Sequence, residues 1–487
     1  MSNSFQHGRP QLKRTISGSG FFCLAFGAMI GVGWITTLGS WLGNAGPLGA
    51  IAAFVAGGAL MLSIGLCYAE LTPMIPVTGG EVAYAYKSLG TRKAFLIGWF
   101  LAFGYLSVCA FEAVSIGIVL GYLFPVLDVI PLYQIHNFQV FLPHLVLAFL
   151  FTGFIGWINH RGVNVAMKVQ IFLTALLLLC ASLFIGAGII NGDISNLKPY
   201  LPTNGKSTMW AGFLQVFVMA PFWFVGFDTI PQAAEEHRSP ELIKRLGLFI
   251  VIAIIGSTFF YVMIILAASL AVPWQDIVNP PSELDKKLPT AFAFRNALKS
   301  DLTTTLVLST GLIGLLTSWN GFFIAGTRVL FSLGRGHILN PGFGKVHPKY
   351  GTPTKAILFG SIVTALGACM GKGALLAFVN VGSFCIAIAF LGVSISLLSL
   401  RRNEPQMHRP YKLPFGKTIA IIAALGSLFI LVAMVVPKSP ASLSFPLEWS
   451  ILLILAISGV ICWMFSRRVR NQVSEEERAD LILMPHD

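Results

Sequence analysis

Charged residues are scarce in this sequence. Asp, Glu, Lys and Arg make up 11% of the 487 residues, whereas hydrophobic residues make up 55%. A soluble domain carries about 25% charged residues. A chain with so few charges cannot keep its whole surface in water, so we expect lipid to cover much of it. The composition therefore excludes a soluble globular protein.

Paired cysteines are also missing. None of the seven cysteines belongs to a Cys-x-x-Cys motif, and most lie within apolar stretches, where cysteine behaves as a small hydrophobic residue. No intramembrane group of His, Cys and Asp has the spacing of a metal site or of a nucleophile with its base. We therefore expect no metal, no cofactor and no enzymatic activity. Asn-x-Ser/Thr acceptor sites are absent too, which favours a bacterial inner membrane.

Long apolar stretches recur along almost the whole chain. A transmembrane helix needs about 20 apolar residues. The pattern predicts an all-α membrane protein with about 12 transmembrane helices in a single domain over residues 1–487. The predicted spans are 20–40, 48–71, 93–123, 141–158, 163–190, 210–230, 246–272, 302–333, 356–370, 375–400, 419–436 and 447–465.

The positive charges are unevenly distributed between the two ends of the predicted helices. Of the 33 Lys and Arg residues, 24 lie in one set of alternate segments and eight in the other, and Lys168 lies inside a span. Short cytoplasmic loops carry an excess of Lys and Arg. We therefore expect a multi-pass protein of the cell membrane with both termini in the cytoplasm. The same loops account for the net charge of +13, so no nucleic-acid partner is expected.

The first predicted span contains three closely spaced glycines, Gly27, Gly31 and Gly33. Each weakens a helix by about 1 kcal/mol relative to alanine, and lipid tolerates a broken helix only where it is buried or lines a cavity. A break would present backbone N–H groups at a half-helix N-terminus, which suits a carboxylate. The alternative is close helix packing through small residues.

The sixth predicted span contains a second interruption, where Pro221 and Gly226 precede Asp228. Proline removes a backbone donor and clashes with the preceding turn. Interrupted segments at corresponding positions of two halves are typical of a transporter site. Because the interruptions are five spans apart, the two halves have opposite topology. We predict that both spans are broken, near Gly31 and Gly226, and face each other at mid-membrane.

Glu112 lies near the middle of the third predicted span. An intramembrane carboxylate is costly and is by default a functional hypothesis. Glu112 can pair with a cationic substrate, carry a proton, or form a neutral hydrogen bond to another helix. The sequence leaves these three roles open.

Further polar residues lie in the fifth and eighth predicted spans. Lys168 is near the cytoplasmic start of the fifth, where a lysine can also extend to the membrane interface. Asn320 is in the middle of the eighth, beside Thr317 and Ser318. Polar residues of this kind can also simply join helices by hydrogen bonds.

Aromatic residues flank both interruptions. Trp34 follows the first, and Phe222 and Trp223 lie within the second. Aromatic faces attract cations, so these side chains can wall a pocket for an ammonium group. Packing between helices is the alternative role.

Five sequence strings, in the same order, resemble signatures of the amino acid–polyamine–organocation superfamily, and in particular bacterial amino acid permeases. The first is the Gly-rich string of the first span, and the second includes a Pro-Val-Thr-Gly-Gly-Glu run. The resemblance extends from the first span to the end of the tenth. The strings are residues 27–33, 69–84, 224–240, 327–335 and 409–414.

The resemblance implies a fold of the LeuT type. In this fold residues 20–190 and 210–400 form two inverted repeats of five helices, and residues 419–465 add two further helices. Residues 1–17 and 468–487 are then cytoplasmic tails.

The resemblance also implies where a substrate binds. The carboxylate of an amino acid would meet the amides around Gly31, and its ammonium would meet carbonyls of both breaks. Lys168 resembles the fifth-span lysine of proton-coupled bacterial members, whose ammonium takes the place of a sodium ion. The ion-coupling candidates are Lys168, Thr317 and Ser318. The substrate-site candidates are Ala28, Ile30, Gly31, Val32, Gly33, Trp34, Glu112, Phe222, Trp223, Val225, Gly226 and Asn320.

The function that these observations favour is secondary active transport of an amino acid by alternating access. The expected coupling is to protons rather than sodium, as symport or exchange. The alternative is a permease for a polyamine, ethanolamine or another amine, with Glu112 as the counter-charge, because Glu112 is not part of the family pattern. A channel is disfavoured because no repeated filter-like carbonyl segment is present.

Overall fold

The chain folds as an all-α membrane protein in the computed structural model. Within the described residues, ten helices are long and apolar enough to cross a membrane. Two further helices, α15 and α16, lie at the remaining predicted spans, although α16 has only 15 residues. The total of 12 spans therefore stays a prediction. The described residues are 10, 12, 14–135, 138–202, 209–280 and 289–483.

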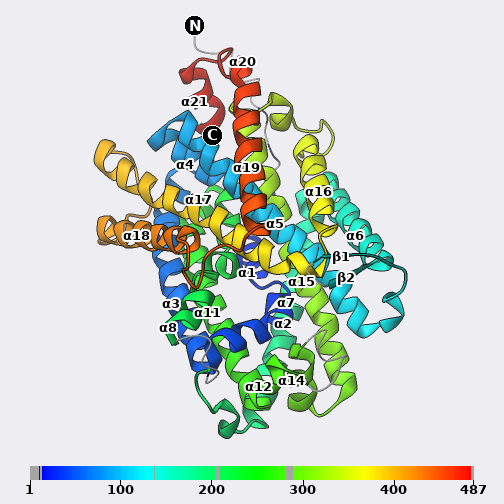
Figure 1. Cartoon of the computed structure of the whole chain (residues 1–487). Coiled ribbons are helices and arrows are strands. Elements are labelled where there is room, and N and C mark those ends of the chain that lie inside the picture. The colour runs from blue at the N-terminus through cyan, green and yellow to red at the C-terminus, as the bar shows by residue number, and fades with distance from the viewer. Residues whose placement is uncertain are drawn as a thin grey trace.

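The elements are labelled in chain order in Figure 1. Up to residue 202 they are α1 Gly18–Met29, α2 Gly33–Thr36, α3 Leu38–Met74, α4 Gly80–Leu89, α5 Thr91–Leu123, η1 Pro125–Leu127, β1 Pro131–Ile135, β2 Phe138–Phe141, α6 Leu142–Arg161, α7 Val163–Ile190 and η2 Ile194–Leu197. From residue 209 they are α8 Met209–Phe217, α9 Ala220–Phe224, α10 Thr229–Gln232, η3 Ala234–Glu236, η4 Pro240–Arg245, α11 Leu246–Ala271, α12 Trp274–Val278, α14 Pro289–Leu298, α15 Asp301–Arg335, η5 Pro341–Gly344, α16 Thr354–Ala368, η6 Lys372–Ala374, α17 Leu375–Asn403, α18 Gly416–Val435, α19 Leu447–Phe465, α20 Arg467–Arg470 and α21 Glu475–Leu483.

The interior is formed by α1 and α5, whose apolar stretches are mostly buried by other helices. α5 packs along α15 and α17, and α3 packs along α11. In contrast, α19 exposes large apolar side chains such as Leu453 and Phe465. An apolar surface of this extent is stable in lipid and not in water. The central helices are therefore the ones positioned to line a solute path.

A β-hairpin, which the sequence did not lead us to expect, follows α5. β1 pairs with β2 in antiparallel register, with an irregularity between Pro131 and Tyr133. The hairpin lies at the edge of the molecule beside α6 and α16 (Figure 1), and both strands contact η6. It covers one end of the helices there. We call this end of the molecule the hairpin side.

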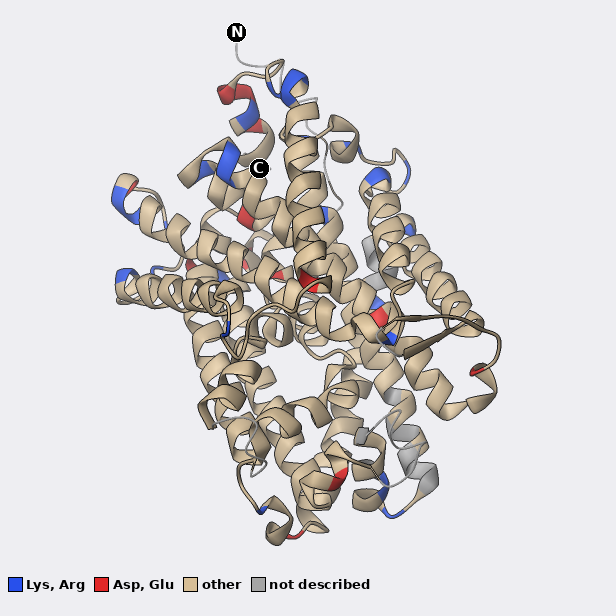
Figure 2. Ribbon diagram, viewed as in Figure 1, with Lys and Arg blue, Asp and Glu red and all other residues tan. Residues whose placement is uncertain are grey.

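Both termini lie away from the hairpin, at the end of the molecule that holds α20 and α21 (Figure 1), and we call this end the terminal side. Figure 2 places most of the Lys and Arg segments toward this end. Among the basic residues, Arg401 and Arg409 pair with Glu70, and Lys87 pairs with Glu404. The asymmetry agrees with the uneven charge distribution of the sequence, in which the loops of this end are the more basic.

The C-terminal tail is more ordered than its polar composition suggests. Residues 475–483 form α21, in which Arg478 and Ile482 share one face and are buried. The Arg478 Nε donates to the Gly336 carbonyl at the end of α15 (3.1 Å). The Tyr86 hydroxyl of α4 donates to the Glu475 carbonyl (3.0 Å). The tail regions 1–9 and 484–487 lie outside the described residues.

Candidate substrate site

The first predicted break is present, between α1 and α2. α1 ends at Met29, and residues 30–32 are not helical. Gly31 is needed for close approach: a Cβ added there would lie 2.2 Å from the Glu112 Oε1 and 2.7 Å from the Ser318 Oγ. Real Cβ atoms do not approach so closely, so a side chain at this position would displace its neighbours. The break thus brings backbone groups against Glu112.

The second predicted break is also present, between α9 and α10. Gly226 has φ +130°, a conformation that favours glycine. The Asp228 Oδ1 accepts from the Gly226 amide (2.8 Å), and the Tyr105 hydroxyl donates to its Oδ2 (2.8 Å). A Cβ added to Gly226 would lie 2.7 Å from the Met29 nitrogen. The prediction that two broken helices face each other is therefore confirmed.

Glu112 lies beside the first break, where we expected the carboxylate of a substrate to bind. Its side chain is only 2% exposed. Its Oε1 lies against Gly31 in the first break and beside the Ser318 hydroxyl of α15, and the Val32 amide is the backbone group that interacts with its carboxyl. Its Oε2 has no hydrogen-bond partner among the described residues. A buried carboxyl with a spare acceptor is unusual, because buried polar groups are normally paired.

Aromatic side chains close the space beside the breaks. The ring of Trp223 lies against Gly33, where an added Cβ would be 2.2 Å from its Cζ3. The Tyr261 hydroxyl donates to the Met29 carbonyl (2.7 Å) and lies 3.2 Å from the Trp223 carbonyl. These carbonyls belong to the two breaks. From the sequence, we expected carbonyls of both breaks to bind the ammonium group of a substrate.

The cavity that remains at the breaks has a volume of about 20 Å³, room for about one water molecule. The site is therefore closed around its own side chains. Six of the predicted substrate-site residues line it together with Ser318. They are Ala28, Gly31, Gly33, Glu112, Phe222 and Trp223.

The other predicted substrate-site residues lie next to this cavity or away from it. Ile30, Val32, Val225 and Gly226 form the breaks themselves. Trp34 is buried in edge contact with Phe260 (5.7 Å between ring centroids) and does not line the cavity.

Asn320, another predicted substrate-site residue, is not among the residues that line this cavity. Its Oδ1 accepts from the Asn159 Nδ2 (3.0 Å), and its Nδ2 donates to the Gln170 Oε1 (3.2 Å). It thus joins α6, α7 and α15 by hydrogen bonds between side chains. The sequence alone does not show whether the face of α15 that carries Asn320 points toward the breaks.

The predicted coupling residues are not brought together either. The Thr317 hydroxyl lies 3.2 Å from the Gly27 carbonyl and 2.8 Å from the Gly314 carbonyl. Lys168 is exposed and forms no hydrogen bond or ion pair with the first or eighth span among the described residues, so its coupling role stays a prediction. Gln170 and Thr174 of α7 face α1, and both contact the Cys23 carbonyl.

We expect substitution of Lys168 by alanine to have little effect. An exposed lysine contributes little to helix packing, so uptake should stay within about twofold of the wild type, as for surface substitutions generally. Initial rates of uptake across a range of pH, normalised to folded protein, measure this. A complete loss of uptake would restore the coupling role.

Two buried ion pairs lie between the end of the second break and α15. The Arg328 Nε donates to the Glu236 Oε1 (3.0 Å), and the Arg335 Nη1 donates to the Glu235 Oε2 (2.9 Å). Burial raises the pKa of the Glu236 carboxyl, and the Arg328 guanidinium opposes that rise. The backbone amide of Thr78 also donates to Glu235 (3.0 Å). These contacts join the end of the second break to α15 and to the chain after α3.

Several site residues escaped the sequence reasoning. Tyr261 carries no local signal, because a tyrosine within an apolar span is ordinary. Asp228 was part of a recognised string, and its intramembrane carboxylate was a signal that could have identified it as the residue that holds the second break. Glu235 and Glu236 were likewise in that string, but their partners lie about 100 residues away.

Similarity to known proteins agrees with this architecture. The amino acid permease family model matches residues 16–457. The chain belongs to the amino acid permease family. The permease is thus a transporter of the amino acid–polyamine–organocation superfamily, not an enzyme.

Several curated proteins resemble this permease over most of its length. The branched-chain amino acid permease BcaP of Bacillus subtilis is 28% identical over 87% of this chain and 89% of its own length. The methylthioribose transporter of the same organism is 26% identical, over 86% and 88%. The chloroplastic cationic amino acid transporter 7 of Arabidopsis thaliana is 28% identical, over 88% and 72%.

Proposed function

We infer that this permease carries an amino acid across the cytoplasmic membrane together with a proton, independently of sodium. The observation that supports this most is the contact of the Glu112 carboxyl with the Val32 amide. An incoming substrate carboxylate needs the same amide. Two like charges in a low-dielectric site repel strongly, so Glu112 must bind a proton or move when the substrate arrives. Proton binding at Glu112 then accompanies substrate binding.

The ammonium of the substrate would bind between the two breaks. The Tyr261 hydroxyl donates to the Met29 carbonyl and lies 3.2 Å from the Trp223 carbonyl. Both carbonyls are therefore oriented toward the same donor position. The faces of Phe222 and Trp223 line the cavity and favour a nearby cation. Names of relatives support this substrate class, since BcaP and the cationic transporter are named for amino acids.

Alternating access would use the breaks as hinges. In this proposal residues 20–190 and 210–400 are inverted repeats that rock against each other, and residues 419–465 are additional helices. The terminal side is cytoplasmic, in keeping with its excess of Lys and Arg, and the membrane is a bacterial inner membrane. The buried ion pairs then hold the cytoplasmic path closed. Both symport and exchange are compatible with this cycle.

A second candidate is a permease for an amine that has no carboxylate. The contact of Glu112 with the first break also supports this candidate. Glu112 already occupies the position expected for a substrate carboxylate, so its own carboxylate could pair with the ammonium of an amine. The relative named as a methylthioribose transporter carries, by its name, a solute other than an amino acid. A thermal-shift screen with amino acids and amines separates the two candidates, because ligands stabilise the state that they bind.

Reconstituted vesicles test proton coupling directly. An inward gradient of one pH unit is equivalent to about 1.4 kcal/mol per proton and thus supports about tenfold accumulation. We expect this accumulation in the wild type without sodium. Glu112→Gln should abolish it, because an amide cannot bind and release the proton, while exchange of substrate for substrate continues.

A matched control is Glu448→Gln, which changes another buried carboxyl that bonds to Asn380 (2.8 Å) rather than to a break. It should retain pH-driven accumulation. Accumulation driven only by sodium, or a normal response of Glu112→Gln to the pH gradient, would contradict the proposal.

A further inference from the structure

Two buried carboxyl groups lie next to the second break, outside the cavity that holds Glu112. Glu81 belongs to the start of α4, which contacts α10 and lies beside α21 (Figure 1). Asp228 directly precedes α10 and accepts from the Gly226 amide. Both carboxyl side chains are fully buried. The transport cycle proposed above gives no role to Glu81.

Two consecutive glycines bring Glu81 to α10. A Cβ added to Gly80 would lie 2.6 Å from the Pro231 Cβ. Gly79 has φ +89°, a conformation that favours glycine. The start of α4 therefore packs directly on α10, and Glu81 reaches Gln232, the last residue of that helix.

Neutral groups donate the hydrogen bonds that these two carboxyl groups accept within the described part of the chain. The Tyr68 hydroxyl donates to the Glu81 Oε1 (2.8 Å), and the Gln232 Nε2 donates to its Oε2. The Asp228 carboxyl accepts from the Tyr105 hydroxyl and from a backbone amide. The buried arginines of α15 pair with η3 instead. Neither acid forms an ion pair with a described Lys or Arg.

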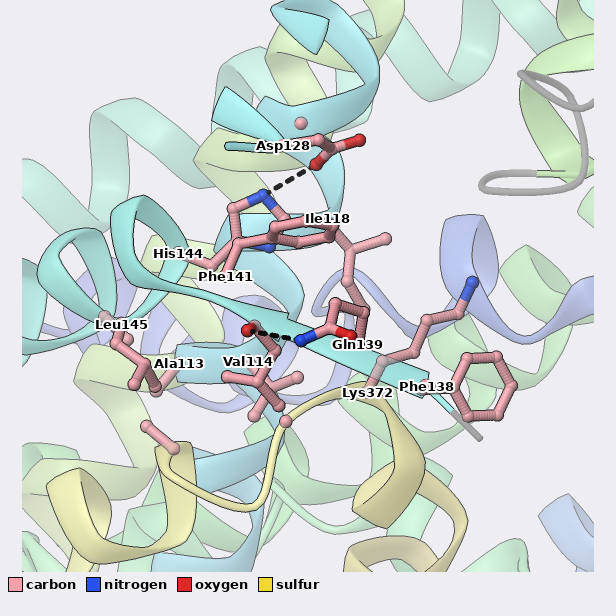
Figure 3. Close-up of a pocket in the computed structure, with 15 residues that line it drawn as sticks. Ala113, Val114, Ile118, Asp128, Phe138, Gln139, Phe141, His144, Leu145 and Lys372 are labelled. Atoms are coloured by element: carbon pink, nitrogen blue, oxygen red, sulfur yellow. Dashed lines mark hydrogen bonds and ion pairs between the residues drawn. The ribbon is translucent and has the colours of Figure 1, made fainter. Parts of the chain in front are cut away.

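A different arrangement surrounds the acid of a larger cavity, which the hairpin lines and whose volume is about 190 Å³ (Figure 3). There the Asp128 Oδ1 lies 3.1 Å from the His144 Nε2, and an imidazole can become a cation near neutral pH. The Lys372 Nζ of the same cavity lies 5.3 Å from the centroid of the Phe138 ring. The charges of that cavity thus have partners of their own, whereas the two acids at the second break have no cationic partner.

Two ionised carboxylates without a cation are unfavourable in a buried network, because such groups bind protons rather than keep their charge. Burial raises the pKa of the Glu81 carboxyl, and the Asp228 carboxylate raises it further. The remaining titratable groups that face Glu81 are tyrosines, which are neutral near pH 7. They are Tyr68, Tyr84 and Tyr105. We therefore expect at least one of the two acids to hold a proton.

The Gln232 side chain supplies the acceptor that a protonated Glu81 needs. Gln232 is fully buried, and its Oε1 has no hydrogen-bond partner among the described residues. The Nε2 of the same amide contacts the Glu81 Oε2. A protonated carboxyl carries one O–H donor, and a half turn of the amide presents Oε1 to it. The unused acceptor thus fits the protonated form of Glu81.

We propose that Glu81 and Asp228 form a second proton-binding site, in which Glu81 carries the proton while the terminal side is closed. The Glu81 O–H donates to the Gln232 Oε1, and the Tyr68 hydroxyl donates to the other Glu81 oxygen. When α4 and α10 separate, water reaches Glu81 and takes the proton from its carboxyl. Low pH then favours the closed arrangement, and rising pH weakens it, because only the protonated form suits burial. The opening step rests on the alternating access proposed above, whereas the binding of the proton does not.

Infrared spectra of the purified full chain, in a detergent without carbonyl groups, test the protonation directly. A protonated carboxyl has a C=O stretching band that a carboxylate lacks. At neutral pH we expect Glu81→Gln to remove one such band from the wild-type spectrum. Glu404→Gln changes the more exposed acid that pairs with Lys87 and should remove none. An unchanged band in Glu81→Gln, or its loss only in Asp228→Asn, would overturn the proposal.

Tyr68→Phe provides a measurement that does not depend on the folding of Glu81→Gln. It removes one hydrogen bond to the Glu81 carbonyl oxygen, so the band should move to higher wavenumber without loss of intensity. A band that does not move would contradict the assignment to Glu81. Glu112→Gln should leave the position of this band unchanged, so a failure of proton coupling at Glu112 does not affect the result.

Hydrogen–deuterium exchange tests the link between the proton and closure. Peptides that cover residues 80–89 and 229–236 are compared between wild type and Glu81→Gln at the same pH, so that intrinsic exchange rates cancel. We expect equal rates at about pH 5, and about tenfold or faster exchange in the wild type at about pH 8, because the glutamine stays neutral. A ratio that does not change with pH would show that Glu81 only joins helices, which would overturn the link.

Discussion

Replacement of Gly31 by leucine is expected to abolish uptake while leaving folded protein in the membrane. The new Cβ would lie 2.2 Å from the Glu112 Oε1 and 2.7 Å from the Ser318 Oγ. The side chain would therefore displace Glu112 and fill the space next to the Val32 amide. Gly33→Leu should act similarly, because its Cβ would be 2.2 Å from the Trp223 ring. Misplaced groups at a site commonly reduce rates by about a hundredfold, and we expect at least this loss.

Two other glycines provide matched controls within spans. A Cβ added to Gly153 of α6 or Gly186 of α7 meets no atom within 4 Å. Gly153→Leu and Gly186→Leu should thus retain uptake in the same assay, with folded protein quantified by size-exclusion chromatography. Full uptake by Gly31→Leu would mean that this glycine serves only helix packing and that the substrate does not approach the first break.

Removal of Arg328 is expected to have the second large effect, on stability. Both members of the Arg328–Glu236 pair are at most 1% exposed. Removing one partner of a buried ion pair leaves an uncompensated charge and typically costs about 3–5 kcal/mol. Arg328→Ala should therefore weaken the closed terminal side strongly and lower the midpoint of thermal unfolding. The double change Arg328→Met with Glu236→Leu should recover much of the loss, because apolar residues can replace a buried pair.

The exposed pair of Lys87 and Glu404 offers the comparison. Its atoms are 3.1 Å apart, but both side chains are about one-third exposed. Exposed pairs contribute roughly 0–1 kcal/mol, so Lys87→Ala should shift the unfolding midpoint little. Equal shifts for Arg328→Ala and Lys87→Ala would show that Arg328 does not carry a buried, paired charge in the membrane.

Local chemistry explains why the two breaks could be predicted. Glycine and proline alter backbone preferences wherever they occur, so residues 27–33 and Pro221 with Gly226 indicated interrupted helices without knowledge of the fold. The importance of Glu112 was equally readable, since a carboxylate in an apolar span needs a partner. The identity of that partner, the Val32 amide, was not readable, because it lies 80 positions earlier in the chain.

The faces of the spanning helices were much harder to predict. In a soluble protein, polar residues mark the outer face of a helix. Here lipid and interior are both apolar, so the sequence of α7 does not show which side faces lipid. The family resemblance assigned a coupling role to Lys168, which is exposed, and Asn320, assigned to the substrate site, bonds to Asn159 and Gln170.

The sequence alone indicated that this protein is an α-helical membrane protein, that two of its helices are broken, and that Glu112 is a carboxylate within a span that needs a partner. These properties follow from composition and from the intrinsic behaviour of glycine, proline and buried charge. Only the tertiary structure decided that Glu112 lies against the first break, that Arg328 pairs with Glu236, and that a hairpin lines a second cavity. Such contacts join residues far apart in the chain, and their geometry depends on helix rotation and packing, which a one-dimensional pattern does not record.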